Sequence, residues 1–187
     1  MPEKYSNHMD SPEGGPRRES KMELTETGIA TKPEDINECL ELYQQALNEF
    51  FDEMNKIKKI GDESVNIRVV GVSGGIVSGK GRPGIFESTS SYQDALNKAT
   101  YEKHRGQSSD DYPSDLDVVY EIEPNLDTED ASRLKEIELI TQGIYEKFGV
   151  VIDATRANKL IISIPIEELL NDGLIKKFIS YHPELNQ

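Results

Sequence analysis

Apolar residues recur every three or four positions along the segment that follows Pro33. The apolar stripe consists of Ile36, Leu40, Tyr43, Leu47, Phe50, Met54 and Ile57. This spacing places the stripe on one face of a long helix. Thr31 as the N-cap, Pro33 and acidic residues in the first turn indicate where the helix begins, and Gly61-Asp62 indicates where it ends.

Further helices are predicted in three places. Residues 90–101 form a modest helix with a serine cap, and Asp127-Thr-Glu-Asp130 caps a second one that Gly149 closes. The stripe of this second helix is Leu134, Ile137, Ile140, Ile144 and Phe148. Residues 166–180 form one or two short helices, interrupted at Asp172-Gly173.

Four short apolar runs predict β-strands. They cover residues 66–72, 114–122, 150–155 and 160–164. The last two runs are separated by "RANK", so we expect them to form a hairpin, which Pro165 ends. The order of elements predicts a mixed sheet backed by helices, that is, one α/β or α+β domain over residues 33–187.

Residues 1–32 differ in composition from the rest. This segment is rich in Pro, Gly, Ser, Glu and Lys and has no periodicity, so we expect a disordered tail. The lone cysteine, Cys39, excludes an internal disulfide. The chain has neither a run resembling a secretory signal nor one long enough to cross a bilayer, which favours a cytoplasmic protein without a membrane partner. The net charge of -14 disfavours a general nucleic-acid coat protein.

The stretch "SDLDVVYEI" places two acids on one face of a predicted strand. Side chains alternate along a strand, so Asp115 and Asp117 point one way while the apolar Leu116 and Val118 point the other. Adjacent carboxylates repel each other unless a cation or a hydrogen-bond network compensates. Alternatively, the pair belongs to a solvated face without a function.

A third acid, Asp153, lies inside the apolar run "VVIDAT". An uncompensated buried carboxylate is costly, so this position needs a reason. Supplying a third ligand to a divalent metal held by Asp115 and Asp117 is one such reason. The other is an edge or turn position at which Asp153 reaches water.

The stretch "SGGIVSGKGRPG" is dense in glycine. Gly74 to Lys80 fits the spacing of a P-loop, but Gly81 stands where that loop needs a hydroxyl for Mg²⁺, and "GRPG" does not open a helix. The stretch also resembles the S-G-G-x-D-S loop of ATP pyrophosphatases, although Val77 replaces its aspartate.

The order of these motifs resembles the DNA polymerase β-like nucleotidyltransferase superfamily. A strand ending in Gly74-Gly75 is followed by "SDLDVVY" and then by Asp153, and Arg105-Gly106 precedes the aspartate strand. Gly75 and Asp115 are farther apart than in small members of the superfamily. This spacing implies either an insertion at about residues 79–103 or glycines that are not the family's own.

The resemblance implies a site and a reaction. Asp115, Asp117 and Asp153 would hold Mg²⁺ or Mn²⁺, and the backbone at Ser73, Gly74 and Gly75 would approach the triphosphate of an NTP. Lys80, Arg82 and Arg105 would contact phosphate. The reaction would move a nucleoside monophosphate from the NTP to an acceptor hydroxyl on a protein, an RNA end, a small molecule or another nucleotide.

Two other classes of function fit the sequence. One is a non-catalytic acidic binding protein, such as an inhibitor that covers a basic surface. The other is a degenerate nucleotidyltransferase fold that binds nucleotide without turnover. The three histidines, His8, His104 and His182, lie far apart and lack the spacing of a metal site.

Overall fold

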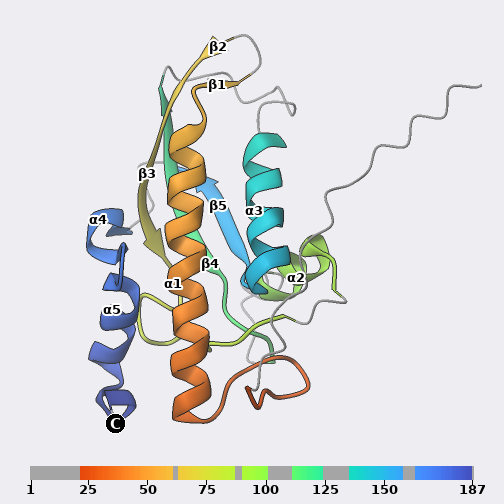
Figure 1. Ribbon diagram of the computed structural model, residues 1–187, viewed down its shortest axis with the longest axis vertical. Helices are drawn as coiled ribbons and strands as arrows, with labels where there is room; N and C mark the ends of the chain where they lie inside the picture. The colour runs from red at the N-terminus through yellow and green to blue at the C-terminus, as the bar shows by residue number, and fades with distance from the viewer. Residues whose placement is uncertain are drawn as a thin grey trace, which may run out of the picture.

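The computed structural model describes residues 22–60, 63–86, 90–100, 111–123, 135–157 and 163–186. Its strands are β1 (Lys59–Ile60), β2 (Glu63–Ser64), β3 (Asn66–Ser73), β4 (Leu116–Glu123), β5 (Ile152–Arg156) and β6 (Ile164–Pro165). The last four form a mixed sheet in the order β5-β4-β3-β6, while β1 and β2 pair separately. The mixed sheet and its helices confirm the predicted α/β (α+β) class (Figure 1).

The predicted hairpin of the last two strands is wrong. β5 and β6 lie at opposite edges of the sheet, with β4 and β3 between them. β5 runs parallel to β4, and β6 pairs antiparallel with β3 through only two residue pairs. The apolar runs indicated strands but carried no information on which neighbour each strand joins. Residues 158–162, which include part of the expected turn, lie outside the described residues.

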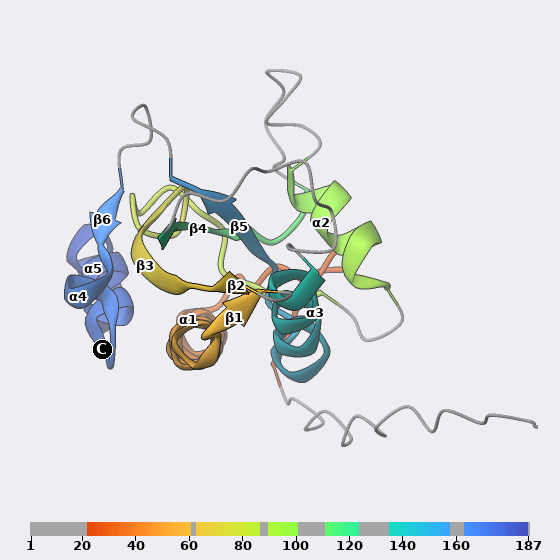
Figure 2. The ribbon, with the colours of Figure 1, turned by 90° about the horizontal axis from the view of Figure 1, so that it is seen from above.

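Two long helices cover one face of the sheet. α1 (Pro33–Lys56) and α3 (Lys135–Phe148) lie side by side there, as Figure 2 shows. The core between helices and sheet joins residues of both, among them Leu40, Leu47, Val69, Leu116, Val118 and Ile152. The side chains of alternate β3 and β4 positions therefore face the helices, which leaves the odd-numbered acids of β4 on the opposite face.

The ends of α1 differ from the expected ones. Its N-cap is Lys32, which makes no side-chain capping bond, so Thr31 is not the cap. Its C-cap is Ile57, and the chain enters β1 before it reaches Gly61. Pro33 in the first turn and the stripe from Leu40 to Met54 agree with the prediction, because every stripe residue in that span is buried.

The shorter helices are α2 (Tyr92–Thr100), α4 (Ile166–Leu169), α5 (Gly173–Tyr181) and the 3-10 turn η3 (Pro183–Asn186). The serine cap of α2 is confirmed, because the Asp94 N–H donates to Ser91 Oγ at 3.2 Å. Gly149, with a φ of 72°, ends α3 as expected. The break at Asp172-Gly173 is also confirmed, since α5 begins at Gly173. The predicted cap at residues 127–130 lies outside the described residues.

Part of the expected tail contacts the domain. Leu24 forms a β-bridge with Ala30, and Ile29 forms one with Gly84. Ala30 is buried. Residues 24–30 thus pair with each other and with Gly84, while residues 1–21 lie outside the described part of the chain. None of the described helices has the length and apolar composition needed to cross a bilayer.

Candidate metal centre

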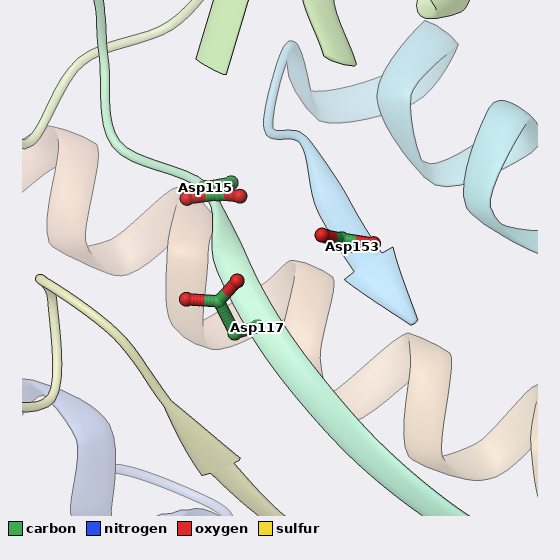
Figure 3. Close-up of side chains that lie close together, drawn as sticks. All are labelled: Asp115, Asp117 and Asp153. Atoms are coloured by element: carbon green, nitrogen blue, oxygen red, sulfur yellow. The ribbon is translucent and has the colours of Figure 1, made fainter. Parts of the chain in front are cut away.

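The parallel pairing of β4 and β5 brings three acids together. Asp117 on β4 is the register partner of Asp153 on β5, and Asp115 stands immediately before β4. Each residue offers a carboxylate oxygen, and the three oxygens lie within 4.8 Å of one another. Figure 3 shows the three carboxylates on one side of the sheet, with α1 behind it. The structure thus brings together all three acids singled out from the sequence.

Burial distinguishes these acids from ordinary surface carboxylates. Asp115 is only 2% exposed, and Asp117 and Asp153 are half-buried. Three carboxylates this close repel one another, and removal from water strengthens the repulsion. Asp153 lies on the edge strand β5 and is partly exposed, as the alternative interpretation of this position expects. Its place in one cluster with the buried Asp115 and with Asp117 is the feature that neither alternative interpretation expects.

The donor set fits a hard divalent cation. Mg²⁺ binds carboxylate oxygens at about 2.0–2.1 Å, so oxygens on opposite sides of the ion are roughly 4.2 Å apart. The three carboxylate oxygens lie within 4.8 Å of one another, which is close to the spacing that a single such ion requires. The three acids can therefore hold a metal ion, with water or substrate oxygens completing the coordination.

The glycine stretch begins directly beside the acids. Ser73, at the end of β3, is the register partner of Asp117. Gly74 has a φ of 94°, and a Cβ built on it would lie 2.1 Å from Asp117 Oδ2. Only glycine permits both this backbone conformation and this approach of the carboxylate. Ser73 and Gly74 thus lie beside the acid cluster, while their contact with a triphosphate stays a prediction.

Residues 74–81, the glycine loop, fold back on themselves. The Gly75 carbonyl accepts hydrogen bonds from the Lys80 N–H at 3.0 Å and the Gly81 N–H at 2.8 Å. Ile76 and Val77 are buried and fix the loop to the core. The chain after Gly81 continues irregularly to Phe86, and α2 begins only at Tyr92. No helix follows the loop directly, so the P-loop interpretation is wrong.

Ser114 joins the glycine loop to the start of β4. Its Oγ accepts a hydrogen bond from the Arg82 N–H at 3.0 Å, and its own N–H donates to the Arg82 carbonyl at 3.0 Å. The buried Tyr43 hydroxyl of α1 donates to the Ser114 carbonyl. The sequence analysis missed both Ser114 and Tyr43, because an isolated polar residue before a strand and a stripe residue of a helix carry no functional signal.

The three cationic residues that were predicted to bind phosphate differ in their positions in the structure. Lys80 is exposed on the glycine loop. The Nε of Arg82 donates to the Tyr112 carbonyl at 3.2 Å, so this side chain at least partly fixes the backbone before β4. Arg105 lies outside the described residues.

Comparison with protein-family models, curated proteins and solved structures finds no match to this chain. The likeness to the nucleotidyltransferase superfamily therefore stays a prediction from the order of the motifs.

A hollow of about 210 Å³ opens beside Asp153. Its lining comes from α2, α3, β4 and β5, and consists of Tyr92, Gln93, Leu96, Tyr120, Ile137, Glu138, Thr141, Asp153 and Ala154. The Tyr92 hydroxyl donates to the Ile152 carbonyl at 2.9 Å, which fixes α2 against the start of β5. Burial raises the pKa of Tyr92, and the nearby charges of Asp153 and Asp115 add to the shift. The residues of this hollow come from four separate elements, so local pattern does not indicate it.

Proposed function

We propose that this chain is a metal-dependent nucleotidyltransferase, which moves a nucleoside monophosphate from an NTP to an acceptor hydroxyl. The observation that carries the proposal is the meeting of Asp115, Asp117 and Asp153 against the backbone of Gly74. Carboxylates that share a divalent cation beside an open backbone loop suit a substrate rich in phosphate oxygens.

In this proposal the position of each residue determines its role, either in binding the metal or in binding the triphosphate. Asp115, Asp117 and Asp153 hold Mg²⁺ or Mn²⁺. An ion held by these three acids would supply positive charge to the phosphate oxygens and would favour ionisation of the acceptor hydroxyl. Ser73, Gly74 and Gly75 lie on the Asp117 side of the cluster, so the triphosphate lies along this backbone. The exposed Lys80 supplies positive charge to it.

The acceptor approaches from the Asp153 side. Asp153 belongs both to the acid cluster and to the wall of the hollow. A hydroxyl placed there meets a carboxylate that can hold its proton. The hollow, at about 210 Å³, is smaller than the roughly 300–1,000 Å³ of most ligand pockets, so it suits a single hydroxyl-bearing group. Asp153 and Glu138 contribute negative charge, and the described lining contains no Lys or Arg. This favours an uncharged or cationic acceptor.

The test is transfer of label from α-³²P-NTPs, each supplied with Mg²⁺ and a cell lysate. We expect the parent to label an acceptor and to release pyrophosphate. Asp117→Asn should abolish the labelling, whereas the matched control Asp52→Asn, which changes an exposed carboxylate of α1, should label as the parent does. Metal-dependent NTP binding without labelling or pyrophosphate release would instead indicate a degenerate, nucleotide-binding fold. Absence of NTP binding would contradict the proposal altogether.

A further inference from the structure

The C-terminal segment contacts the far end of the glycine loop through two consecutive residues. Gly79 has a φ of 71°, and a Cβ built on it would lie 2.5 Å from Cβ and Cγ of Tyr181. The next residue, His182, places its Nε2 2.7 Å from the Gly79 carbonyl oxygen. These contacts join parts of the chain that lie far apart in the sequence. We call the contacts of Tyr181 and His182 with Gly79 the C-terminal clasp.

Both ring nitrogens of His182 face oxygens that only accept hydrogen bonds. The Gly79 carbonyl lies at Nε2, and a carboxylate oxygen of Glu184 lies 3.1 Å from Nδ1. A neutral imidazole has one N–H, so it can donate to only one of these oxygens, whereas the doubly protonated ring donates to both. The ring also stacks on Phe178, with centroids 4.7 Å apart and an interplanar angle of 21°. The ring orientation is therefore fixed from three sides.

The surroundings of His182 contain few other charged groups. Lys80 follows Gly79 in the loop, and Lys177 of α5 lies with its Nζ 5.4 Å from the centroid of the Tyr181 ring. Among the described residues, the α1 side chain that bonds to this segment is the neutral Asn37, which donates to the Leu185 carbonyl. Glu184 is thus the acidic group in direct contact with the ring.

We propose that His182 is a positioning residue, which holds the glycine loop in place relative to the three acids. The loop is fixed at one end by β3 and the contact of Gly74 with Asp117, and at the other end by the clasp on Gly79. Loss of the His182 bond removes the side-chain contact at Gly79, so the second end keeps only the backbone bonds to Gly75 and those of the adjacent Arg82 to Ser114. The expected effect on NTP binding rests on the proposed function, because the proposed function places the triphosphate along this loop.

The first test needs no catalysis. The Lys80 N–H belongs to the same peptide group as the Gly79 carbonyl, so its NMR shift responds to the bond that His182 makes. In the full chain we expect His182→Asn to shift the Lys80 amide resonance more than His182→Gln does, because Gln keeps a donor near the position of Nε2 and Asn does not. Lys176→Gln, on the exposed side of α5, should leave the resonance in place. Equal shifts in His182→Asn and His182→Gln, or no shift in His182→Asn, would overturn the proposal.

The second test compares two variants in NTP binding. Asn places its amide near Nδ1 and cannot reach Gly79, whereas Gln places its amide near Nε2. We expect His182→Asn to raise the KM or Kd for NTP by up to about tenfold, as the loss of one hydrogen bond does, with kcat nearly unchanged. His182→Gln should restore most of the affinity. The control is Lys176→Gln, which removes an exposed ion pair of α5 and should bind NTP as the parent does.

The two arms separate the two proposals. If the parent neither binds nor turns over NTP, the proposed function fails, and the Lys80 amide shift in the His182 variants alone decides whether the clasp exists. If NTP binds and His182→Asn binds it as well as the parent does, His182 does not position the loop, and the clasp proposal fails while the proposed function stands.

Discussion

Asp117 on β4 and Asp153 on β5 are direct partners in a parallel register. Side chains of register partners project from the same face of a sheet, so the two carboxylates meet although they belong to distant parts of the chain. Asp115, two positions before Asp117, projects from the same face and completes the cluster. The candidate metal centre is thus a consequence of strand pairing.

The first prediction concerns Gly74. In Gly74→Ala the new Cβ would meet Asp117 Oδ2 at 2.1 Å, so the carboxylate must rotate away from the other two acids. We expect a strong loss of affinity for Mn²⁺ and a loss of about 1–3 kcal/mol in the free energy of unfolding, because the positive φ strains alanine. Calorimetric titration and thermal unfolding measure the two effects.

The control for this change is Gly143→Ala in α3. A Cβ at Gly143 meets nothing within 4 Å, and alanine favours a helix by about 0.5–1 kcal/mol over glycine. This variant should be more stable than the parent and should bind Mn²⁺ equally well. Equal Mn²⁺ affinity in Gly74→Ala and Gly143→Ala would show that Gly74 does not shape the metal centre.

Only part of the metal centre was predictable from the sequence. The alternation of side chains along a strand predicted that Asp115 and Asp117 lie on one face. The observed register of β4 with β5 and the clustering of the carboxylates confirm this. The approach of Asp153 depends on β5 joining β4 and on β6 joining β3, whereas the short "RANK" connection favoured a hairpin. The pairing of strands depends on how the whole chain packs, and the local pattern of apolar residues carries no information on that packing.

The limits of local pattern appear elsewhere too. The apolar stripe fixed the face of α1 but not its end, because Ile57 continues the helical period after the helix has stopped. Ser114 bonds through its hydroxyl and its N–H to the backbone of Arg82, next to the glycine loop, and an isolated serine before a strand does not indicate such a partner. Such a contact leaves no mark in the residue types on which a sequence prediction depends.

A second prediction concerns Gln44, an α1 residue whose side chain binds the backbone at the start of α5. The Leu174 N–H, in the first turn of α5, donates to Gln44 Oε1 at 2.9 Å, and Gln44 Nε2 donates to the Leu169 carbonyl at 2.8 Å. Asp172, the N-cap of α5, makes no side-chain capping bond, so Gln44 takes over part of that role. The C-terminal clasp therefore depends on this buried amide.

We expect Gln44→Leu to lower the free energy of unfolding by about 2–4 kcal/mol, because it leaves a buried N–H and a buried carbonyl without their partner. Urea denaturation measures this loss. Gln142→Leu is the matched control, since Gln142 is exposed on α3, where its amide donates to the exposed Glu146. A loss below about 0.5 kcal/mol in Gln44→Leu would contradict the assigned role.

A third prediction concerns stability at alkaline pH. Burial raises the pKa of the Cys39 thiol from 9.0 to about 12, and burial also raises the pKa of the Tyr43 hydroxyl well above 10.0. The folded state then keeps protons that the unfolded state releases. The unfolded state binds fewer protons in this window, so the free energy of unfolding falls as pH rises from about 9 towards 12, by about 1.4 kcal/mol per pH unit for each group.

Urea denaturation at pH 8 to 10 tests the share of Cys39. Cys39→Ala removes the thiol, so its stability should fall less steeply between pH 9 and 10 than that of the parent. Tyr43 has the higher reference pKa and contributes mainly above this range. Parallel slopes for the two proteins would show that the thiol titrates in the folded state much as it does in the unfolded state.

The most direct test of the account is calorimetric titration of the full chain with Mn²⁺. We predict that the parent binds the ion and that Asp115→Asn, Asp117→Asn and Asp153→Asn each lose at least about tenfold in affinity, the lower bound for disturbing a metal site. Asp52→Asn should bind as the parent does, and circular dichroism should show every variant folded. A parent that binds no Mn²⁺, or folded variants that all bind it as tightly as the parent, would contradict the account.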